Sequence, residues 1–308
     1  IKCKKKIIHF FNASEKNKNL KNINLILNKL FKFNYNRNDC IISLGGGITG
    51  DVSAFAASIF KRGLKFINIP STLLAQVDSS IGGKSGINNK YGKNLIGSFM
   101  QPDLVVSDIS LLKSLPKREI ICGYGEIFKH SIISKRNTFN YLKNNFSKIL
   151  NLKSPFIGKA ITDSCKIKRN IVQADEKEKN LRKVLNLGHT FAHAYESTLS
   201  YSKKLNHGEA VILGIVSSTK FSMENNILNE NDYKQILNHI SLLKLPMNLN
   251  NYFEKKDINS IIKYMKSDKK NNSSLINLIL IKKIGKVILG SRYNQKKIKK
   301  FLIKELIN

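Results

Sequence analysis

Hydrophobic residues in the first third of the chain fall into short apolar runs separated by a helical pattern. Cys40–Leu44 is an apolar run that leads into Gly45–Gly47, and residues 49–60 continue with small and apolar residues at helical spacing. Two more apolar runs, Leu64–Ile69 and Leu104–Ser107, predict buried strands. Because strands alternate with a helix here, we expect a parallel sheet in an α/β fold.

The pattern changes near residues 116–122, where glycine becomes rarer and longer helical segments begin. We therefore expect two domains. The first is an α/β domain over residues 1–118, and the second is a mostly helical domain over residues 119–308.

Within the second domain, Gly123–Leu142 and Phe156–Ala174 carry helical periodicity. A late apolar stretch, Leu275–Leu289, predicts a β-hairpin with Gly285 at its turn. The sequence contains no visible internal repeat.

The 308 residues are 42% hydrophobic, which is enough to bury a large core and excludes a disordered chain. Lys and Arg total 53 against 21 acidic residues, a formal charge of +32. The excess is spread along the chain as lysine among Asn and Ile, so it indicates solvated basic faces and neither a nucleic-acid nor a membrane partner. A catalytically inactive basic protein that binds nucleic acid nonspecifically is the alternative, and a steep salt dependence of DNA binding would favour it.

The four cysteines lie far apart and form no Cys-x-x-Cys pair: Cys3, Cys40, Cys122 and Cys165. They indicate neither a disulfide framework nor a thiolate zinc site. No apolar run has the length of a membrane span, and Ile1–Phe11 lacks the apolar core of a signal peptide. We therefore expect a cytoplasmic protein.

Two glycine-rich stretches have the composition of phosphate-binding segments. Gly45–Asp51 follows a strand and opens a helix, where backbone N–H groups can hold a pyrophosphate, although a tight turn explains the pattern equally well. Pro70–Lys84, closely followed by Gly92–Asn94, combines lysines and an amide with glycine, which suits a phosphorylated, acidic substrate. A surface loop with solvated lysines is the alternative for the second stretch.

Histidines gather in one short window of the second domain. His189 and His193 are four residues apart and so share one face of a helix, and His207 follows eighteen residues after His189. Glu126 lies at the head of a separate helix and offers a carboxylate. Two histidines and a carboxylate with one open position are typical of a catalytic zinc site.

The motifs occur in the order of a known family. Gly45–Lys93, Gly125–Lys129, Ala174–His193 and His207–Glu209 together resemble the 3-dehydroquinate synthase family of the sugar-phosphate cyclase superfamily, and the similarity runs from about residue 12 to about residue 290. The resemblance implies a Rossmann-like NAD-binding domain, then a mostly α-helical metal-binding domain, with the active site between them. It also implies NAD and Zn²⁺ as cofactors, with Co²⁺ as an alternative metal.

The resemblance assigns roles to residues position by position. The metal ligands are Glu126, His189 and His207. His193 lies near the metal without binding it, and either supports a ligand or transfers a proton. The remaining catalytic residues are Lys129, Lys168, Arg182 and Asn186. The substrate contacts are Arg62, Asp78, Lys84, Asn94 and Lys269.

The NAD contacts come from several segments of the first domain. The glycine-rich turn is one of these segments, and Lys84 is shared with the substrate. The resemblance gives them as Glu15, Lys18, Gly47, Ile48, Thr49, Gly50, Asp51, Ser71, Thr72, Lys84, Lys93, Leu111, Leu112, Lys113 and Ser114.

The implied activity is a carbon–oxygen lyase reaction of the shikimate pathway, on the route to chorismate and the aromatic amino acids. It converts 3-deoxy-D-arabino-heptulosonate 7-phosphate, a phosphorylated sugar acid, to 3-dehydroquinate and phosphate. A homodimer is implied because Arg62 of one subunit reaches the phosphate in its neighbour. Another NAD- and metal-dependent sugar-phosphate cyclase or polyol dehydrogenase is the alternative, but Lys129, Lys168, Arg182 and Asn186 suit the carboxylate and hydroxyls of the dehydroquinate substrate.

The chain departs from the family pattern at a few positions. Ser71, Ser85, Gly125 and Ala192 stand where Thr, Thr, Ala and Gly are common, and none of these changes removes a charge or a ligand. Relatives also carry an additional strand and helix region before the aligned start. We therefore expect an NAD-binding domain that is shortened at its start.

Overall fold

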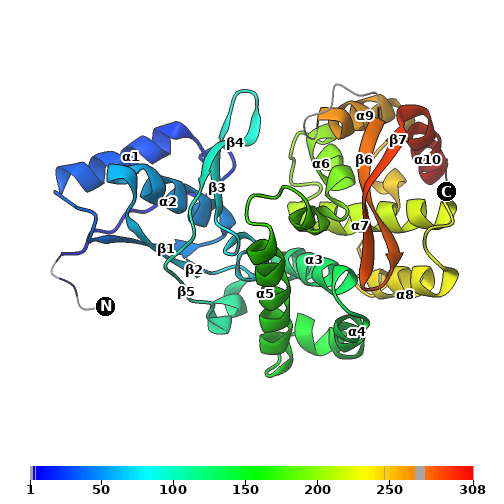
Figure 1. The fold of residues 1–308 in the computed structure, drawn as a ribbon, viewed down its shortest axis with the longest axis horizontal. Coiled ribbons are helices and arrows are strands. Elements are labelled where there is room, and N and C mark those ends of the chain that lie inside the picture. Colours follow the sequence, from blue (N-terminus) through cyan, green and yellow to red (C-terminus); the bar gives the residue numbers. More distant parts are fainter. Residues whose placement is uncertain (1–2, 4, 246, 268–274, 308) are drawn as a thin grey trace. The chain divides into compact units, whose positions relative to one another are not determined.

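The computed structural model describes residues 3, 5–245, 247–267 and 275–307 of the chain. The chain divides into two compact units, Ile1–Leu115 and Pro116–Asn308 (Figure 1). The division falls three residues before the expected boundary at residue 118.

The first unit is an α/β fold around a three-stranded parallel sheet with strand order β1-β2-β5. A separate antiparallel pair, β3 and β4, forms a hairpin. Its elements are α1 (Leu20–Lys32), β1 (Cys40–Gly45), α2 (Gly47–Ile59), η1 (Phe60–Arg62), β2 (Lys65–Pro70), η2 (Ala75–Ser79), β3 (Lys84–Asn89), β4 (Gly92–Phe99), β5 (Leu104–Val105) and η3 (Ile109–Ser114).

The predicted strand, glycine turn and helix are confirmed. β1 and β2 occupy the first two apolar runs, and α2 begins at Gly47, two residues before the expected start. The two strands pair in parallel from Cys40 opposite Lys65 to Gly45 opposite Pro70. Because parallel strands end at the same edge of the sheet, the segments that follow Gly45 and Pro70 lie side by side.

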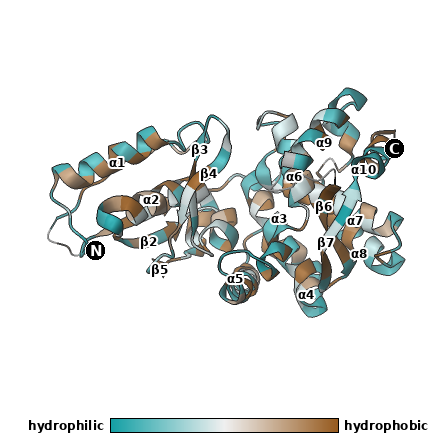
Figure 2. Ribbon diagram, turned by 45° about the horizontal axis from the view of Figure 1, so that its top comes forward, coloured by the Kyte–Doolittle hydropathy of each residue, from teal (hydrophilic) through white to brown (hydrophobic). Residues whose placement is uncertain are grey.

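Helices α1 and α2 provide the core of this unit. Ile23 of α1 packs with Val52, Phe55 and Ala56 of α2, and all four side chains are buried. A second cluster joins Ala54 and Ala57 of α2 to Phe66 of β2. Hydrophobic and hydrophilic residues alternate along α1 (Figure 2), as expected for a helix with one buried face.

A strand is confirmed within Leu104–Ser107, but it is only two residues long and the expected burial is wrong. Only Leu104 and Val105 pair with β2, while Leu104 is 51% exposed and Val106 is 41% exposed. β5 stands at the edge of the sheet order, so its strand pairing covers it on one side alone.

The sequence patterns did not predict the β3–β4 hairpin. Many of its residues are polar or glycine, and such residues have a low propensity to form strands. Glycine is nevertheless required here, because a Cβ at Gly97 would lie 2.0 Å from the backbone oxygen of Ser85 on the paired strand. The close backbone approach adds to side-chain packing, since Ile87 of β3 is fully buried in the cluster with α1 and α2.

The second unit is mostly helical, as predicted. Its helices gather around α7, which contacts α3, α6, α8 and β6 and has buried residues on all its faces. Among the described residues, no helix has both the length and the hydrophobicity of a membrane span. The elements are α3 (Lys117–Ile133), α4 (Arg136–Leu150), α5 (Phe156–Ala174), η4 (Leu181–Asn186), α6 (His189–Thr198), α7 (His207–Glu224), α8 (Glu230–Ser241), η5 (Leu249–Asn251), η6 (Lys255–Asp257), α9 (Ile258–Ser267), β6 (Leu275–Lys283), β7 (Lys286–Asn294) and α10 (Gln295–Ile307).

The late hairpin is confirmed, and it also explains where one predicted helix breaks. β6 and β7 turn at Gly285, whose φ of 90° favours glycine. The Gly285 N–H donates to the carbonyl oxygen of Ile132 at 2.7 Å, at the end of α3. This contact takes a carbonyl from the last turn of α3, and the expected continuous helix Gly123–Leu142 is instead divided between α3 and α4.

A buried histidine links α3 and α8. His239 is 3% exposed, stacks on Phe128 at a ring-centroid distance of 4.9 Å, and lies 2.6 Å through Nε2 from the hydroxyl of Tyr124. Burial raises the pKa of Tyr124, so the hydroxyl keeps its proton and donates. Burial, and next the charge of Lys143, lowers the pKa of His239 to about 4, so the ring is neutral at pH 7.

We expect His239 to make the protein less stable as the pH falls. His239 binds a proton near pH 6.5 in the unfolded chain but only near pH 4 in the folded chain. The free energy of unfolding therefore decreases as the pH falls between these two values. Between pH 7 and pH 5 this loss amounts to about 2 kcal/mol from His239 alone. Urea unfolding at both values should show a smaller pH dependence for His239→Gln, whose side-chain oxygen can still accept from Tyr124. An equal pH dependence in parent and variant would contradict this account.

Candidate active site

The glycine turn of the first unit lies against the segment that follows β2. The Ser71 N–H donates to the carbonyl oxygen of Gly45 at 2.9 Å, and a Cβ at Gly46 would lie 3.2 Å from Cγ2 of Thr72. A Cβ at Gly45 would come within 2.6 Å of Oγ1 of Thr49. Glycine therefore keeps this turn tight and close to Ser71 and Thr72, which are both predicted NAD contacts.

The N-terminus of α2 can hold an anion. Gly50 makes the first helical hydrogen bond, to the carbonyl oxygen of Gly46, so the N–H groups of Gly47, Ile48 and Thr49 precede that bond. The helix dipole adds a partial positive charge at this end. The geometry fits the pyrophosphate of a dinucleotide such as NAD.

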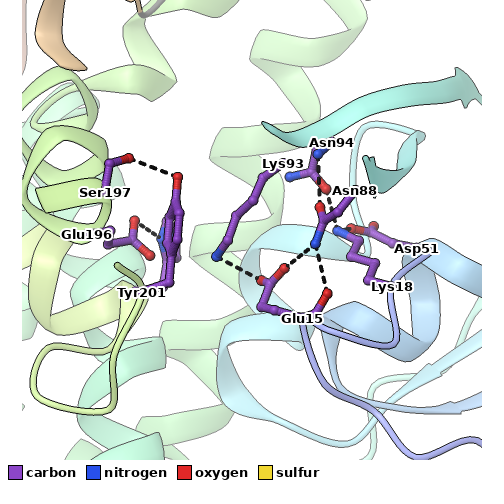
Figure 3. A network of polar contacts seen from close by, with 10 residues as sticks. Glu15, Lys18, Asp51, Asn88, Lys93, Asn94, Glu196, Ser197 and Tyr201 are labelled. Carbon is purple, nitrogen blue, oxygen red and sulfur yellow. Dashed lines mark hydrogen bonds and ion pairs between the residues drawn. The ribbon is translucent and has the colours of Figure 1, made fainter. Parts of the chain in front are cut away.

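A polar network joins the amino-terminal segment to α2 and to the β3–β4 hairpin (Figure 3). The ammonium of Lys18, which is buried, pairs with Asp51 and donates to Oδ1 of Asn94 at 2.5 Å. Lys93 pairs with Glu15 at 3.2 Å. The structure thus brings together four predicted NAD contacts and one predicted substrate contact.

Asn88 of β3 connects the two halves of this network. Its Nδ2 donates to the Oε2 of Glu15 at 2.8 Å, and its Oδ1 accepts from the backbone N–H of Asn94 at 3.0 Å. Burial alone would raise the pKa of Glu15, but the hydrogen bond from Asn88 and the charges of Lys93 and Lys18 outweigh it and lower that pKa. Glu15 is therefore a carboxylate at neutral pH.

Asp78 lies in the π-helical turn η2, a geometry that is frequent at functional sites. The turn is anchored by Gln76, which is fully buried and donates through Nε2 to the carbonyl oxygens of Pro70 and Asp108 at 3.2 and 2.8 Å. Lys84 is exposed at the start of β3. Its preceding residue, Gly83, has a φ of 65°, which favours glycine.

Arg62 lies on a strained, exposed turn. Lys61 and Arg62 have φ values of 46° and 67°, unusual for residues with a Cβ. A residue distant in sequence stabilises the turn: Nε of Arg37 donates to the Lys61 carbonyl oxygen at 2.7 Å. Backbone strain of this kind clusters at functional positions.

The remaining predicted contacts of the first unit lie in η3, where Asp108 caps the backbone N–H of Ser110. Leu112 is fully buried, so only its backbone can face a cofactor. The other three η3 contacts, Leu111, Lys113 and Ser114, stay predictions. Lys269, a predicted substrate contact, lies outside the described residues.

In the second unit, Glu126, His189 and His207 come together. One ligand atom from each lies within 4.8 Å of the others, and Nε2 of His189 is 3.7 Å from Oε1 of Glu126. Glu126 lies on α3, while the histidines are the first residues of α6 and α7. Ligand atoms around a tetrahedral zinc lie about 3.3–3.6 Å apart, so small side-chain shifts would complete such a site.

Glycines bring these three helices close enough. A Cβ at Gly208 would lie 2.4 Å from the backbone of Cys122, so α7 approaches α3 directly beside Glu126 and His207. A Cβ at Gly214 would lie 2.2 Å from the carbonyl oxygen of Gly188, which immediately precedes His189. Gly125 also faces α7, since a Cβ there would be 2.9 Å from Ile212.

The electrostatics of the cluster suit a cation. The Glu126 side chain is fully buried and forms an ion pair with Lys129, yet neither of its oxygens accepts a well-directed hydrogen bond from the described residues. Burial, then the charges of Lys129, His193 and His207, lowers the pKa of His189 well below its usual 6.5. A neutral imidazole and an incompletely bonded carboxylate fit a divalent metal, because both are deprotonated ligands.

His193 lies beside this cluster. Its ring centroid is 5.3 Å from that of His189 and 6.3 Å from that of His207, and the residue is exposed. It lies one turn after His189 on α6, so it shares that helix face.

The other predicted catalytic residues lie on elements that pack against α3. Lys168 on α5 and Arg182 on η4 are buried, and both elements contact α3. Arg182 donates through its guanidinium to the carbonyl oxygen of Glu176, and Nδ2 of Asn186 donates to Glu178 at 2.6 Å. Two buried cations on adjoining elements suit an anionic substrate.

Three residues that contribute to these arrangements were not predicted. Asn88 and Gln76 organise the first unit, and Glu196 accepts from Nδ1 of His207 in the second. Each acts through contacts between residues distant in sequence, and only the Gly-rich surroundings of Asn88 gave a local signal. Glu209, beside His207 in the sequence, caps α7 and pairs with Arg118, so its contacts are structural.

Models of two families match successive parts of the chain. Residues 8–122 match the 3-dehydroquinate synthase N-terminal family, and residues 123–271 match the 3-dehydroquinate synthase C-terminal family. Among solved structures, a 2-deoxy-scyllo-inosose synthase complexed with carbaglucose-6-phosphate, NAD⁺ and Co²⁺ has a TM-score of 0.84 and 26% identity, covering 96% of this chain and 82% of that one. A 2-epi-5-epi-valiolone synthase from Streptomyces hygroscopicus shares the fold, with a TM-score of 0.84 at 22% identity over 96% of this chain and 81% of that one.

Curated relatives are closer in sequence. The 3-dehydroquinate synthase of Pelagibacter ubique is 60% identical over 299 residues, which are 97% of this chain and 81% of the relative. That of Campylobacter concisus is 40% identical, over 94% of this chain and 81% of the relative. With the fold and the arrangement of Glu126, His189 and His207, these similarities show that the chain belongs to the 3-dehydroquinate synthase family.

Proposed function

We propose that this chain is a carbon–oxygen lyase that converts 3-deoxy-D-arabino-heptulosonate 7-phosphate to 3-dehydroquinate and phosphate. The observation that carries the proposal is the cluster of Glu126, His189 and His207 beside Lys129, with the buried cations Lys168 and Arg182 on adjoining elements. A metal-dependent polyol dehydrogenase has no need for buried cations that match a substrate carboxylate.

Cofactors supply part of the chemistry. When bound, NAD and a divalent cation supply hydride exchange at the hydroxyl-bearing ring carbon and polarisation of that hydroxyl. The N-terminus of α2 would hold the pyrophosphate, and the Glu15–Lys18–Asp51 network would orient the nucleoside end. Glu126, His189 and His207 would hold Zn²⁺, or Co²⁺ as in the inosose synthase relative.

The cations divide the substrate between them in this proposal. Lys168 and Arg182 bind the carboxylate and hydroxyl end, where a planar guanidinium can make two hydrogen bonds. Lys84, Asn94 and Arg62 bind the phosphate end. His193, exposed beside the histidine pair, moves a proton to or from the reacting hydroxyl.

We also propose a homodimer in which Arg62 serves the neighbouring subunit. The support is its position, since it is exposed and lies on a strained turn that the chain maintains through Arg37. An exposed cation held in an unfavourable backbone conformation is suited to reach a group outside its own unit.

The direct test is turnover with the purified chain, NAD⁺, zinc and the heptulosonate phosphate. We expect phosphate and carbocycle to appear in equal amounts, with no net NADH. Glucose 6-phosphate, which has no carboxylate, should be a poor substrate. Preference for glucose 6-phosphate would indicate another cyclase, and net NAD reduction without phosphate release would indicate a polyol dehydrogenase.

The metal assignment predicts the behaviour of His207→Ala. Removing one of three protein ligands should abolish stoichiometric zinc binding, while His193→Ala should retain the metal. We would measure the zinc content of each variant after dialysis and follow zinc binding by fluorescence. Undiminished zinc in His207→Ala would show that the ligand set is wrong.

Lys84 is assigned to the substrate phosphate, so the effect of removing its side chain on binding should depend on whether the ligand carries a phosphate. Lys84→Ala should bind a phosphate-free substrate analogue as well as the parent does and the phosphorylated analogue roughly 10-fold more weakly, as expected for one charge-assisted hydrogen bond. Lys90→Ala, which removes an exposed lysine between β3 and β4, is the matched control and should bind both analogues like the parent. If Lys84→Ala weakens both analogues equally, the residue does not contact the phosphate.

A further inference from the structure

Glu196 of α6 lies against the histidine that opens α7. Its carboxylate, drawn in Figure 3, accepts a hydrogen bond from Nδ1 of His207, and 3.0 Å separates Nδ1 from Oε2. Glu196 is only 7% exposed. Ionised carboxylates are rarely buried to this extent without a specific partner.

The contact decides which nitrogen of His207 is available. A carboxylate only accepts hydrogen bonds, so Nδ1 must carry the proton and Nε2 keeps its lone pair. His189 follows the same arrangement, with Nδ1 3.2 Å from the carbonyl oxygen of Leu187 and Nε2 toward Glu126. Both rings therefore offer Nε2 as the ligand atom.

We propose that Glu196 is a positioning residue for the metal: it fixes the tautomer and orientation of His207 and makes Nε2 a stronger ligand. Carboxylate partners of metal-bound histidines act in this way in other proteins. The inference rests on the proposed metal site. Helix α6 then serves twice, since its first residue is a ligand and Glu196, two turns later, orients the ligand on α7.

The fold holds Glu196 where it can act. Its neighbours on the same helix, Ala194 and Tyr195, are buried, and α6 packs against α7 through the close contact of Gly188 with Gly214. The carboxylate is thus attached to a rigid element and not to a loop. A rigid partner loses little conformational entropy when it orients the imidazole.

The test measures metal affinity in three variants. Glu196→Ala removes the acceptor, and we expect its zinc dissociation constant to rise roughly 10- to 100-fold. Glu196→Gln keeps the volume and a neutral acceptor, so it should weaken zinc binding less than Glu196→Ala. Glu305→Gln is the control, because Glu305 is also 7% exposed and pairs with Lys220 on another helix pair; it should bind zinc like the parent.

Cobalt provides a spectroscopic readout that a general loss of stability would not move. The visible absorption bands of the Co²⁺-loaded protein should shift in both Glu196 variants and stay unchanged in Glu305→Gln. Parent-like zinc affinity and cobalt spectrum in folded Glu196→Ala would overturn the inference. If Glu196→Ala does not fold, the same result in Glu196→Gln overturns it, whereas zinc binding that survives His207→Ala would refute the metal site itself.

Discussion

The buried carboxylate of Glu126 is the constraint on which the second unit depends. A fully buried charge is costly to remove from water and must be compensated by nearby positive groups. Lys129 compensates it from the next turn of α3, and neither carboxylate oxygen accepts a well-directed hydrogen bond from the described residues. The site therefore has a charge and a geometry that a divalent cation satisfies.

Close helix packing delivers the ligands to that carboxylate. Gly208 lets α7 contact α3, and Gly188 and Gly214 let α6 contact α7, so His189 and His207 begin their helices at the same place. Placing both histidines at helix starts makes their positions depend on backbone packing. Glycines also allow a close backbone approach in the NAD-binding unit, where they keep the turn before α2 close to the segment after β2.

The spacing of apolar residues and glycines along the sequence predicted those elements whose position depends on neighbouring residues in the chain. The periodicity of apolar residues predicted α5 at Phe156–Ala174 and the β6–β7 hairpin with its turn at Gly285. The histidine spacing and the family resemblance together predicted the three metal ligands. The β3–β4 hairpin was missed because its sequence has no apolar alternation, and the close backbone approach at Gly97 cannot be seen in the sequence. Glu196 was missed because its contact with His207 depends on how two helices pack, which residue spacing does not encode.

Glu126, His189 and His207 are expected to hold one divalent metal together. Anomalous diffraction at the zinc edge, from crystals of the zinc-loaded protein, tests it most directly. We expect one strong peak about 2.0–2.2 Å from a Glu126 oxygen and from Nε2 of both histidines. A peak bound by other residues, or through Nδ1 of His207, would contradict it.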